Sequence, residues 1–134
     1  MQSRPSVLIV DDEINVARTL QMVFENEGYE VETAGSCADA LQQIDNGHNY
    51  DAIITDLNME TPDVGLKVAR AAKGLQSRPV VVICTGYAST SNSGAALDMH
   101  VDYLATKPVQ LDELISALKR LLARRDDTGT KNGR

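Results

Sequence analysis

The fold is decided by the stretch Ala52-Ile53-Ile54-Thr55-Asp56, an apolar, β-branched run that ends in a carboxylate. Runs without polar alternation are typical of strands that helices cover on both faces of a sheet. Three further runs lead into polar residues: Val7–Val10 before Asp11 and Asp12, Val80–Cys84 before Thr85, and Val101–Ala105 before Lys107. In an open α/β sheet, ligands bind outside the carboxyl ends of the strands. We therefore expect these polar side chains to gather at one edge.

The segments between these runs carry apolar residues at helical spacing and residues that start or stop helices. Ser36, with Asp39 three residues on, matches a capping box with Asp in place of Glu. The patterns predict helices over about 14–26, 36–47, 65–73 and 111–123, a more exposed strand over 29–34, and a weak helical segment rich in Ser, Asn and Gly over 89–98. Strands that alternate with helices indicate a parallel sheet built from βα units.

We therefore predict an α/β fold: a doubly wound (βα)5 three-layer sandwich around a five-stranded parallel sheet of order 2-1-3-4-5. This order places the first and third strands side by side, which makes Asp11 and Asp12 neighbours of Asp56. A length of 134 residues suits one domain. We expect that domain to cover residues 6–123, and residues 124–134 to form a flexible C-terminal tail or the start of a linker.

The composition argues against several classes of protein. The net charge of −6 argues against nucleic-acid binding by this domain, and the basic residues within 119–125 fit a solvated helix face. No stretch approaches the ~20 apolar residues of a membrane span, and residues 1–6 do not resemble a signal peptide, so we expect a cytoplasmic protein that makes no membrane contact. Cys37 and Cys84 have no metal-ligand spacing, and Cys84 is expected to be a buried thiol.

The polar strand ends suit phosphate chemistry. Three carboxylates at one sheet edge repel one another unless a cation neutralises them. An all-oxygen site suits Mg²⁺, which takes one or two carboxylates and a phosphoryl oxygen and keeps several waters. A carboxylate can also attack phosphorus and form an aspartyl phosphate. The Lys107 ammonium and the Thr85 hydroxyl are suited to neutralise and to hydrogen-bond phosphoryl oxygens.

Four motifs in this order carry a family resemblance: Val10-Asp11-Asp12-Glu13, Thr55-Asp56-Leu57-Asn58-Met59, Cys84-Thr85-Gly86-Tyr87 and Thr106-Lys107-Pro108. Over about residues 6–123 the sequence resembles the receiver domain of two-component system response regulators, which has a flavodoxin-like fold. The resemblance implies that Asp56 accepts a phosphoryl group from a sensor histidine kinase or a phosphotransfer protein. It implies a phosphoacceptor signalling domain that catalyses only its own phosphorylation and dephosphorylation, rather than an enzyme.

The resemblance also implies the ligands of the site. Mg²⁺ would be bound by the side chains of Asp12 and Asp56 and by the main-chain carbonyl of Asn58, with Asp11 acting through water. Thr85 and Lys107 would contact the phosphoryl oxygens. The Lys107–Pro108 bond would be cis, which aims the lysine back at the site.

The loop after Asp56 departs from the family pattern. Glu60 stands where the family has proline, and Gly65 arrives one residue late, which indicates a one-residue insertion. The Glu60 carboxylate could modulate the lifetime of a nearby phosphoryl group or could point to solvent, and we favour solvent. Tyr87 is a second candidate for modulating the reaction.

The aromatic switch residue of the family departs as well. Its position, three residues before Lys107, holds Leu104, and Tyr103 comes one residue earlier. Since strand side chains alternate between faces, Tyr103 should lie on the opposite face unless the strand bulges. Otherwise the coupling between Thr85 and an aromatic side chain is absent. His100 stands where the family has a glycine that ends the fourth helix, so we expect activation to be transmitted by a different route.

The leading hypothesis is a phosphorylation switch. Its surface around the fourth helix, fifth strand and fifth helix would bind an output domain or protein partner, or form a phosphorylation-dependent homodimer. One alternative is a Mg²⁺-dependent phosphohydrolase with an Asp nucleophile, but the acid/base carboxylate expected two residues later is Asn58. A flavin module is disfavoured because Asp11, Asp12 and Glu13 would repel the cofactor phosphate. A non-cycling docking receiver would not need the complete set of site residues.

Overall fold

The structure, a computed structural model, describes residues 4–86, 94 and 101–132, with side chains in the last helix described to residue 126. The elements alternate along the chain as β1 (Ser6–Val10), α1 (Ile14–Asn26), β2 (Glu30–Ala34), α2 (Cys37–Asp45), β3 (Ala52–Asp56), α3 (Gly65–Lys73), β4 (Val80–Thr85), β5 (Tyr103–Thr106) and α5 (Leu111–Asn132). The weak helical segment expected over 89–98 lies outside the described residues, apart from Gly94.

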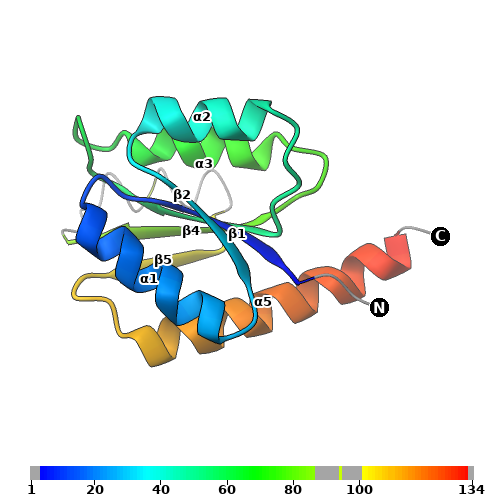
Figure 1. Ribbon diagram of the computed structural model, residues 1–134. Helices are drawn as coiled ribbons and strands as arrows, with labels where there is room; N and C mark the ends of the chain where they lie inside the picture. The colour runs from blue at the N-terminus through cyan, green and yellow to red at the C-terminus, as the bar shows by residue number, and fades with distance from the viewer. Residues whose placement is uncertain (1–3, 87–93, 95–100, 133–134) are drawn as a thin grey trace.

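The five strands form one parallel sheet of order β2-β1-β3-β4-β5, which confirms the predicted fold. Helices α2 and α3 cover one face of the sheet, and α1 and α5 cover the other (Figure 1). Every residue of β3 and β4 is buried, as expected for strands covered on both faces.

Side chains alternate along the strands and divide the core into two layers. The layer under α2 and α3 contains Leu8, Ile53 and Ile83, and the layer under α1 and α5 contains Ile9 and Ile54. In register, Val10 pairs with Thr55 and Asp56 pairs with Cys84, so the carboxyl ends of β1, β3 and β4 meet at one edge of the sheet.

The capping pattern in the sequence correctly marks the start of α2. Ser36 is the N-cap, and its Oγ accepts a hydrogen bond from the Asp39 N–H at 3.1 Å. Helix α2 ends at Asp45, slightly before Gly47, near which the sequence pattern predicted its end.

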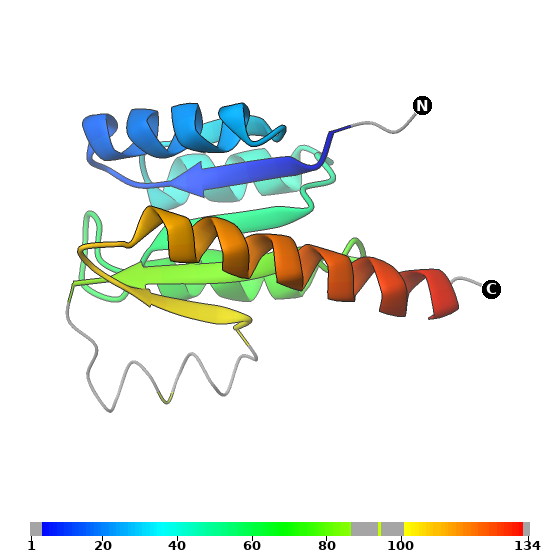
Figure 2. The same cartoon turned by 90° about the horizontal axis from the view of Figure 1, so that it is seen from below.

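The last helix is longer than the apolar pattern predicts, because it continues past Ala123 to Asn132 (Figure 2). The Arg125 guanidinium donates hydrogen bonds to Asp51 Oδ1 at 2.8 Å and to the Asp51 carbonyl oxygen at 2.9 Å. Asp51 Oδ2 also accepts from the Ser6 N–H at 2.7 Å. The ion pair between Arg125 and Asp51 therefore holds α5 to the start of β3. This contact lies in the part of the helix that follows its apolar stripe.

Candidate functional site

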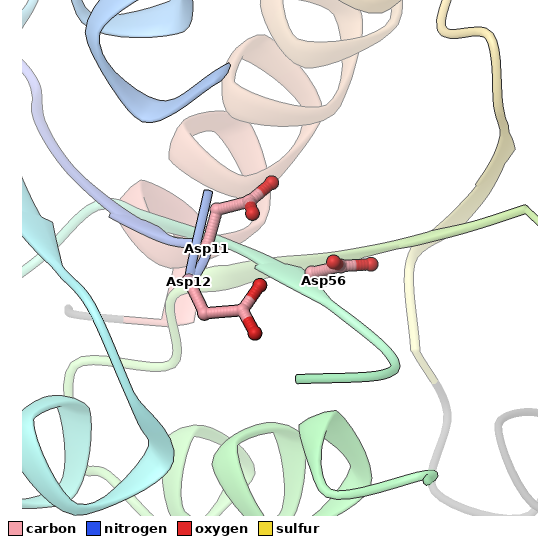
Figure 3. Close-up of side chains that lie close together, drawn as sticks. All are labelled: Asp11, Asp12 and Asp56. Carbon is pink, nitrogen blue, oxygen red and sulfur yellow. The ribbon is translucent and has the colours of Figure 1, made fainter. Parts of the chain in front are cut away.

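The three carboxylates predicted to meet do meet. Asp11 and Asp12 follow β1, Asp56 ends β3, and one carboxylate oxygen from each lies within 4.8 Å of the others (Figure 3). Asp11 and Asp56 are buried and Asp12 is exposed, so the cluster opens to solvent on the Asp12 side. Asp11 Oδ1 accepts a hydrogen bond from the Glu13 N–H at 2.9 Å, which fixes the orientation of that carboxylate.

Lys107 enters the cluster from the end of β5. Its Nζ lies 3.1 Å from Asp56 Oδ2 and 4.0 Å from Asp11 Oδ2. The main-chain N–H of Lys107 donates a hydrogen bond to the Thr85 carbonyl oxygen at 2.8 Å. The Lys107–Pro108 peptide bond is cis, as the family resemblance implied. Burial lowers the pKa of Lys107, but the hydrogen bond and charge of Asp56 outweigh burial, so the net pKa is raised and the ammonium form is favoured.

The cluster carries more negative charge than its ammonium neutralises. Burial raises the pKa of Asp11, and the negative charge of Asp56 raises it further, while the Glu13 N–H and Lys107 oppose both. Hard oxygen donors at the edge of solvent, with unbalanced negative charge, are the donor set that Mg²⁺ prefers. The residues therefore fit a magnesium ion.

Asp11→Asn is expected to stabilise the protein at pH 7 in EDTA. Because the folded pKa of Asp11 is raised above its usual value, the ionised carboxylate destabilises the fold at neutral pH, and this cost disappears as the pH falls through the folded pKa. Urea unfolding should therefore give Asp11→Asn a higher free energy of unfolding at pH 7 and no advantage at pH 3. Asp12→Asn is the comparison, and it should gain less because water already solvates the exposed Asp12 carboxylate. An Asp11→Asn variant less stable than the parent at pH 7 would contradict this reading.

Thr85 ends β4 and is fully buried. It lies on the same face of the sheet as Ile83, because their positions differ by two. On the opposite face, Cys84 lines a cavity of about 420 Å³ between α1 and residues 107–111, which reaches Asp56. Burial and the charge of Asp56 raise the pKa of Cys84 to about 12, so it stays a neutral thiol, as expected for a buried cysteine.

Glu60 is exposed to solvent, as expected, and its carboxylate also has a protein partner that the sequence does not predict. The Cys37 N–H, in the first turn of α2, donates to the two carboxylate oxygens of Glu60 at 3.1 and 3.4 Å. The positive end of the α2 helix dipole favours a carboxylate at this position. No local sequence signal places the β3–α3 loop beside α2, so sequence reasoning could not find this partner.

Gly65 is a site residue that the sequence marked only as a shifted glycine. A Cβ added to Gly65 would lie 2.1 Å from the Asp56 carbonyl oxygen and 2.8 Å from Leu57 Cα. The Gly65 N–H also donates to the Leu57 carbonyl oxygen at 2.8 Å. Helix α3 therefore begins in direct contact with the backbone of Asp56, which requires a residue without a side chain.

Tyr103 and Leu104 lie on opposite faces of β5. Val82 pairs with Tyr103 and Ile83 pairs with Leu104 in unbroken register, so β5 does not bulge here. Tyr103 packs against the core layer under α1 and α5, whereas Leu104 packs against the layer under α2 and α3, on the face that Thr85 shares. Tyr103 therefore lies on the face opposite Thr85. Tyr87 and His100 lie outside the described residues.

A family model for the response regulator receiver domain matches residues 7–119. The chain belongs to the response regulator receiver domains. Its sequence is 35% identical over 118 residues to the response regulator ArlR of Staphylococcus aureus, a match that covers 88% of this chain and 52% of ArlR. The chain thus spans about half the length of the curated relatives it matches.

Solved structures agree with this assignment. A CheY-like response regulator receiver domain protein from Methanospirillum hungatei has a TM-score of 0.88 and 29% identity, with 95% of this chain and 100% of that one covered. The Francisella response regulator receiver domain has a TM-score of 0.79 and 31% identity, with 90% and 98% covered. Among the described residues of this receiver domain, no helix has the length and apolar character needed to span a membrane.

Proposed function

We propose that this receiver domain accepts a phosphoryl group on Asp56 from the phosphohistidine of a sensor histidine kinase or a phosphotransfer protein. The observation that carries the proposal is the position of Asp56, whose Oδ2 lies 3.1 Å from Lys107 Nζ and which shares an acidic cluster with Asp11 and Asp12. This arrangement supplies a nucleophile, a point charge and cation ligands at one end of the sheet.

Asp12 and Asp56 would hold Mg²⁺ with their side chains, the Asn58 main-chain carbonyl would supply a third ligand, and Asp11 would act through water. The Asn58 side chain supports this assignment, because its Oδ1 accepts from the Asp63 N–H at 2.8 Å and is thus engaged within the loop. When bound, the ion supplies positive charge that offsets the carboxylates and the phosphoryl oxygens.

In the proposed reaction, an Asp56 carboxylate oxygen attacks phosphorus in line with the bond to the donor. An O–P bond forms and the N–P bond of the phosphohistidine breaks, and the electron pair of that bond leaves with the imidazole nitrogen. Hydrolysis of the aspartyl phosphate later returns the free carboxylate and inorganic phosphate. Both steps transfer one phosphoryl group and need no redox partner.

Lys107 and Thr85 would stabilise the transferred group. The Lys107 ammonium, placed by the turn after β5, would pair with one phosphoryl oxygen, and the Thr85 hydroxyl at the end of β4 would donate to another. The phosphoryl group would bias two pre-existing conformations of the domain rather than create a new one. With Leu104 in place of an aromatic residue on the Thr85 face, this bias would not travel through Tyr103.

The proposed output surface includes β5, α5 and the fourth helix, of which the last lies outside the described residues. It would bind an output domain or a protein partner in the cytoplasm, or a second copy of the domain. Like other receiver domains, this one would act in signalling rather than in metabolic catalysis.

Phosphoryl incorporation from acetyl phosphate tests the proposal. Intact mass spectrometry should show one phosphoryl group added in Mg²⁺ and none in EDTA, because the unbalanced carboxylates repel the anionic donor without the cation. Equal incorporation in EDTA, or none under either condition, would contradict the proposal. Steady release of phosphate from small phosphate esters over many turnovers would instead favour a phosphohydrolase.

A further inference from the structure

The residues that flank the turn between β2 and α2 are hydrogen-bonded both to the segment that carries Asp11 and to the loop that follows Asp56. On one side, the Asp11 N–H donates to the Ala34 carbonyl oxygen at 3.1 Å. On the other side, the Cys37 N–H donates to the Glu60 carboxylate at 3.1 and 3.4 Å. This turn therefore connects the segment that carries Asp11 to the loop that follows Asp56.

That loop, residues 57–64, carries Asn58 close to its start. Its base is fixed because the Leu57 N–H donates to the Cys84 carbonyl oxygen at 2.8 Å, next to Asp56 in the sheet. Its interior is ordered by the hydrogen bond from the Asp63 N–H to Asn58 Oδ1 at 2.8 Å. Glu60, at the tip, joins the loop to a different element, the first turn of α2.

We propose that Glu60 is a positioning residue for the metal site, a proposal that rests on the Mg²⁺-dependent function given above. Its carboxylate accepts a hydrogen bond from Cys37 and so fastens the loop that carries Asn58 to the β2–α2 turn. At the other end of this turn, the Ala34 carbonyl oxygen accepts a hydrogen bond from the main-chain N–H of Asp11. The ligands from β1 and from the β3–α3 loop are thereby held in one arrangement before the ion binds. Glu60 acts through these segments and does not bind the ion itself.

The competing explanation is that Glu60 only stabilises α2, since a carboxylate near the N-terminus stabilises a helix. Ser36 offers a matched control. Its Oγ accepts from the Asp39 N–H at 3.1 Å, in the same first turn of α2. Ser36→Ala therefore weakens the same helix start without removing a contact to the loop of Asn58.

Calorimetric titration of the full chain with Mg²⁺ tests the proposal. Glu60→Ala should raise the dissociation constant for Mg²⁺ roughly three- to tenfold, less than the 10–100-fold typical of direct partners of metal ligands. Ser36→Ala should lower the melting temperature as Glu60→Ala does but leave the Mg²⁺ affinity unchanged. Glu60→Gln keeps an acceptor oxygen and should restore most of the affinity.

A second readout does not use the metal. In metal-free protein, the amide NMR signals of Asp11 and Asn58 should shift in Glu60→Ala and stay in place in Ser36→Ala. An unchanged Mg²⁺ affinity in Glu60→Ala, equal losses in both alanine variants, or no recovery in Glu60→Gln would each overturn this inference alone. A parent protein that binds no Mg²⁺ would overturn the proposed function and this inference with it.

Discussion

Replacement of Asp56 by asparagine is expected to reduce phosphoryl incorporation from acetyl phosphate and Mg²⁺ to background. An amide has nearly the same shape as a carboxylate, but its oxygen is a far weaker nucleophile toward phosphorus. Asp56 is only 7% exposed, and its Oδ2 lies 3.1 Å from Lys107 Nζ, closer than the 4.0 Å that separates Asp11 Oδ2 from the same ammonium. Intact mass spectrometry of the variant after incubation with both reagents measures the loss.

Asp45→Asn is the matched control for this experiment. Asp45 is exposed at the end of α2 and is not part of the acidic cluster, and the variant makes the same chemical change. It should incorporate as much phosphate as the parent. Equal labelling of Asp56→Asn and the parent would show that the acceptor is a different residue.

Gly65→Ala is expected to lower the free energy of unfolding by about 3 kcal/mol, at the upper end of the usual cost of overpacking. The added Cβ would lie 2.1 Å from the Asp56 carbonyl oxygen and 2.8 Å from Leu57 Cα. Both atoms belong to the backbone, which cannot rotate aside as a side chain can. Either α3 moves away from β3 or the end of β3 shifts, and the second change displaces the Asp56 carboxylate. Urea unfolding and phosphoryl incorporation should therefore both be impaired.

Gly74→Ala is the control for the glycine substitution. Gly74 caps α3 at φ −82°, and an added Cβ would lie 3.5 Å from the nearest backbone oxygen, an ordinary contact. This variant should be unchanged or gain about 0.4–1 kcal/mol, because alanine restricts the unfolded chain. If Gly65→Ala is as stable as Gly74→Ala, the close contact between α3 and Asp56 is wrong.

The strands and the acidic cluster could be predicted because their signals are local. The apolar run of β3 needs cover on both faces, and the sheet order then places Asp56 beside Asp11 and Asp12. The alternation rule likewise placed Tyr103 on the face opposite Thr85, and the regular register of β5 agrees.

The features that the sequence did not reveal depend on contacts between distant segments. The partner of Glu60 is the Cys37 N–H, 23 positions away in the chain, so the composition of the loop alone could not distinguish this contact from solvent. The contact of Arg125 with Asp51, 74 positions away, lies in the extension of α5, where helical periodicity gives no signal. The need for glycine at residue 65 arises from the close approach of α3 to β3.

Borohydride reduction of the phosphorylated parent, followed by peptide mass spectrometry, tests the central claim most directly. Hydride reduces an aspartyl phosphate to the alcohol and releases phosphate, which leaves homoserine at the acceptor position. The account predicts homoserine at residue 56, formed in Mg²⁺ and absent in EDTA, with Asp11 and Asp12 unmodified. Homoserine at residue 11 or 12, or a retained phosphoryl group on another type of side chain, would contradict it.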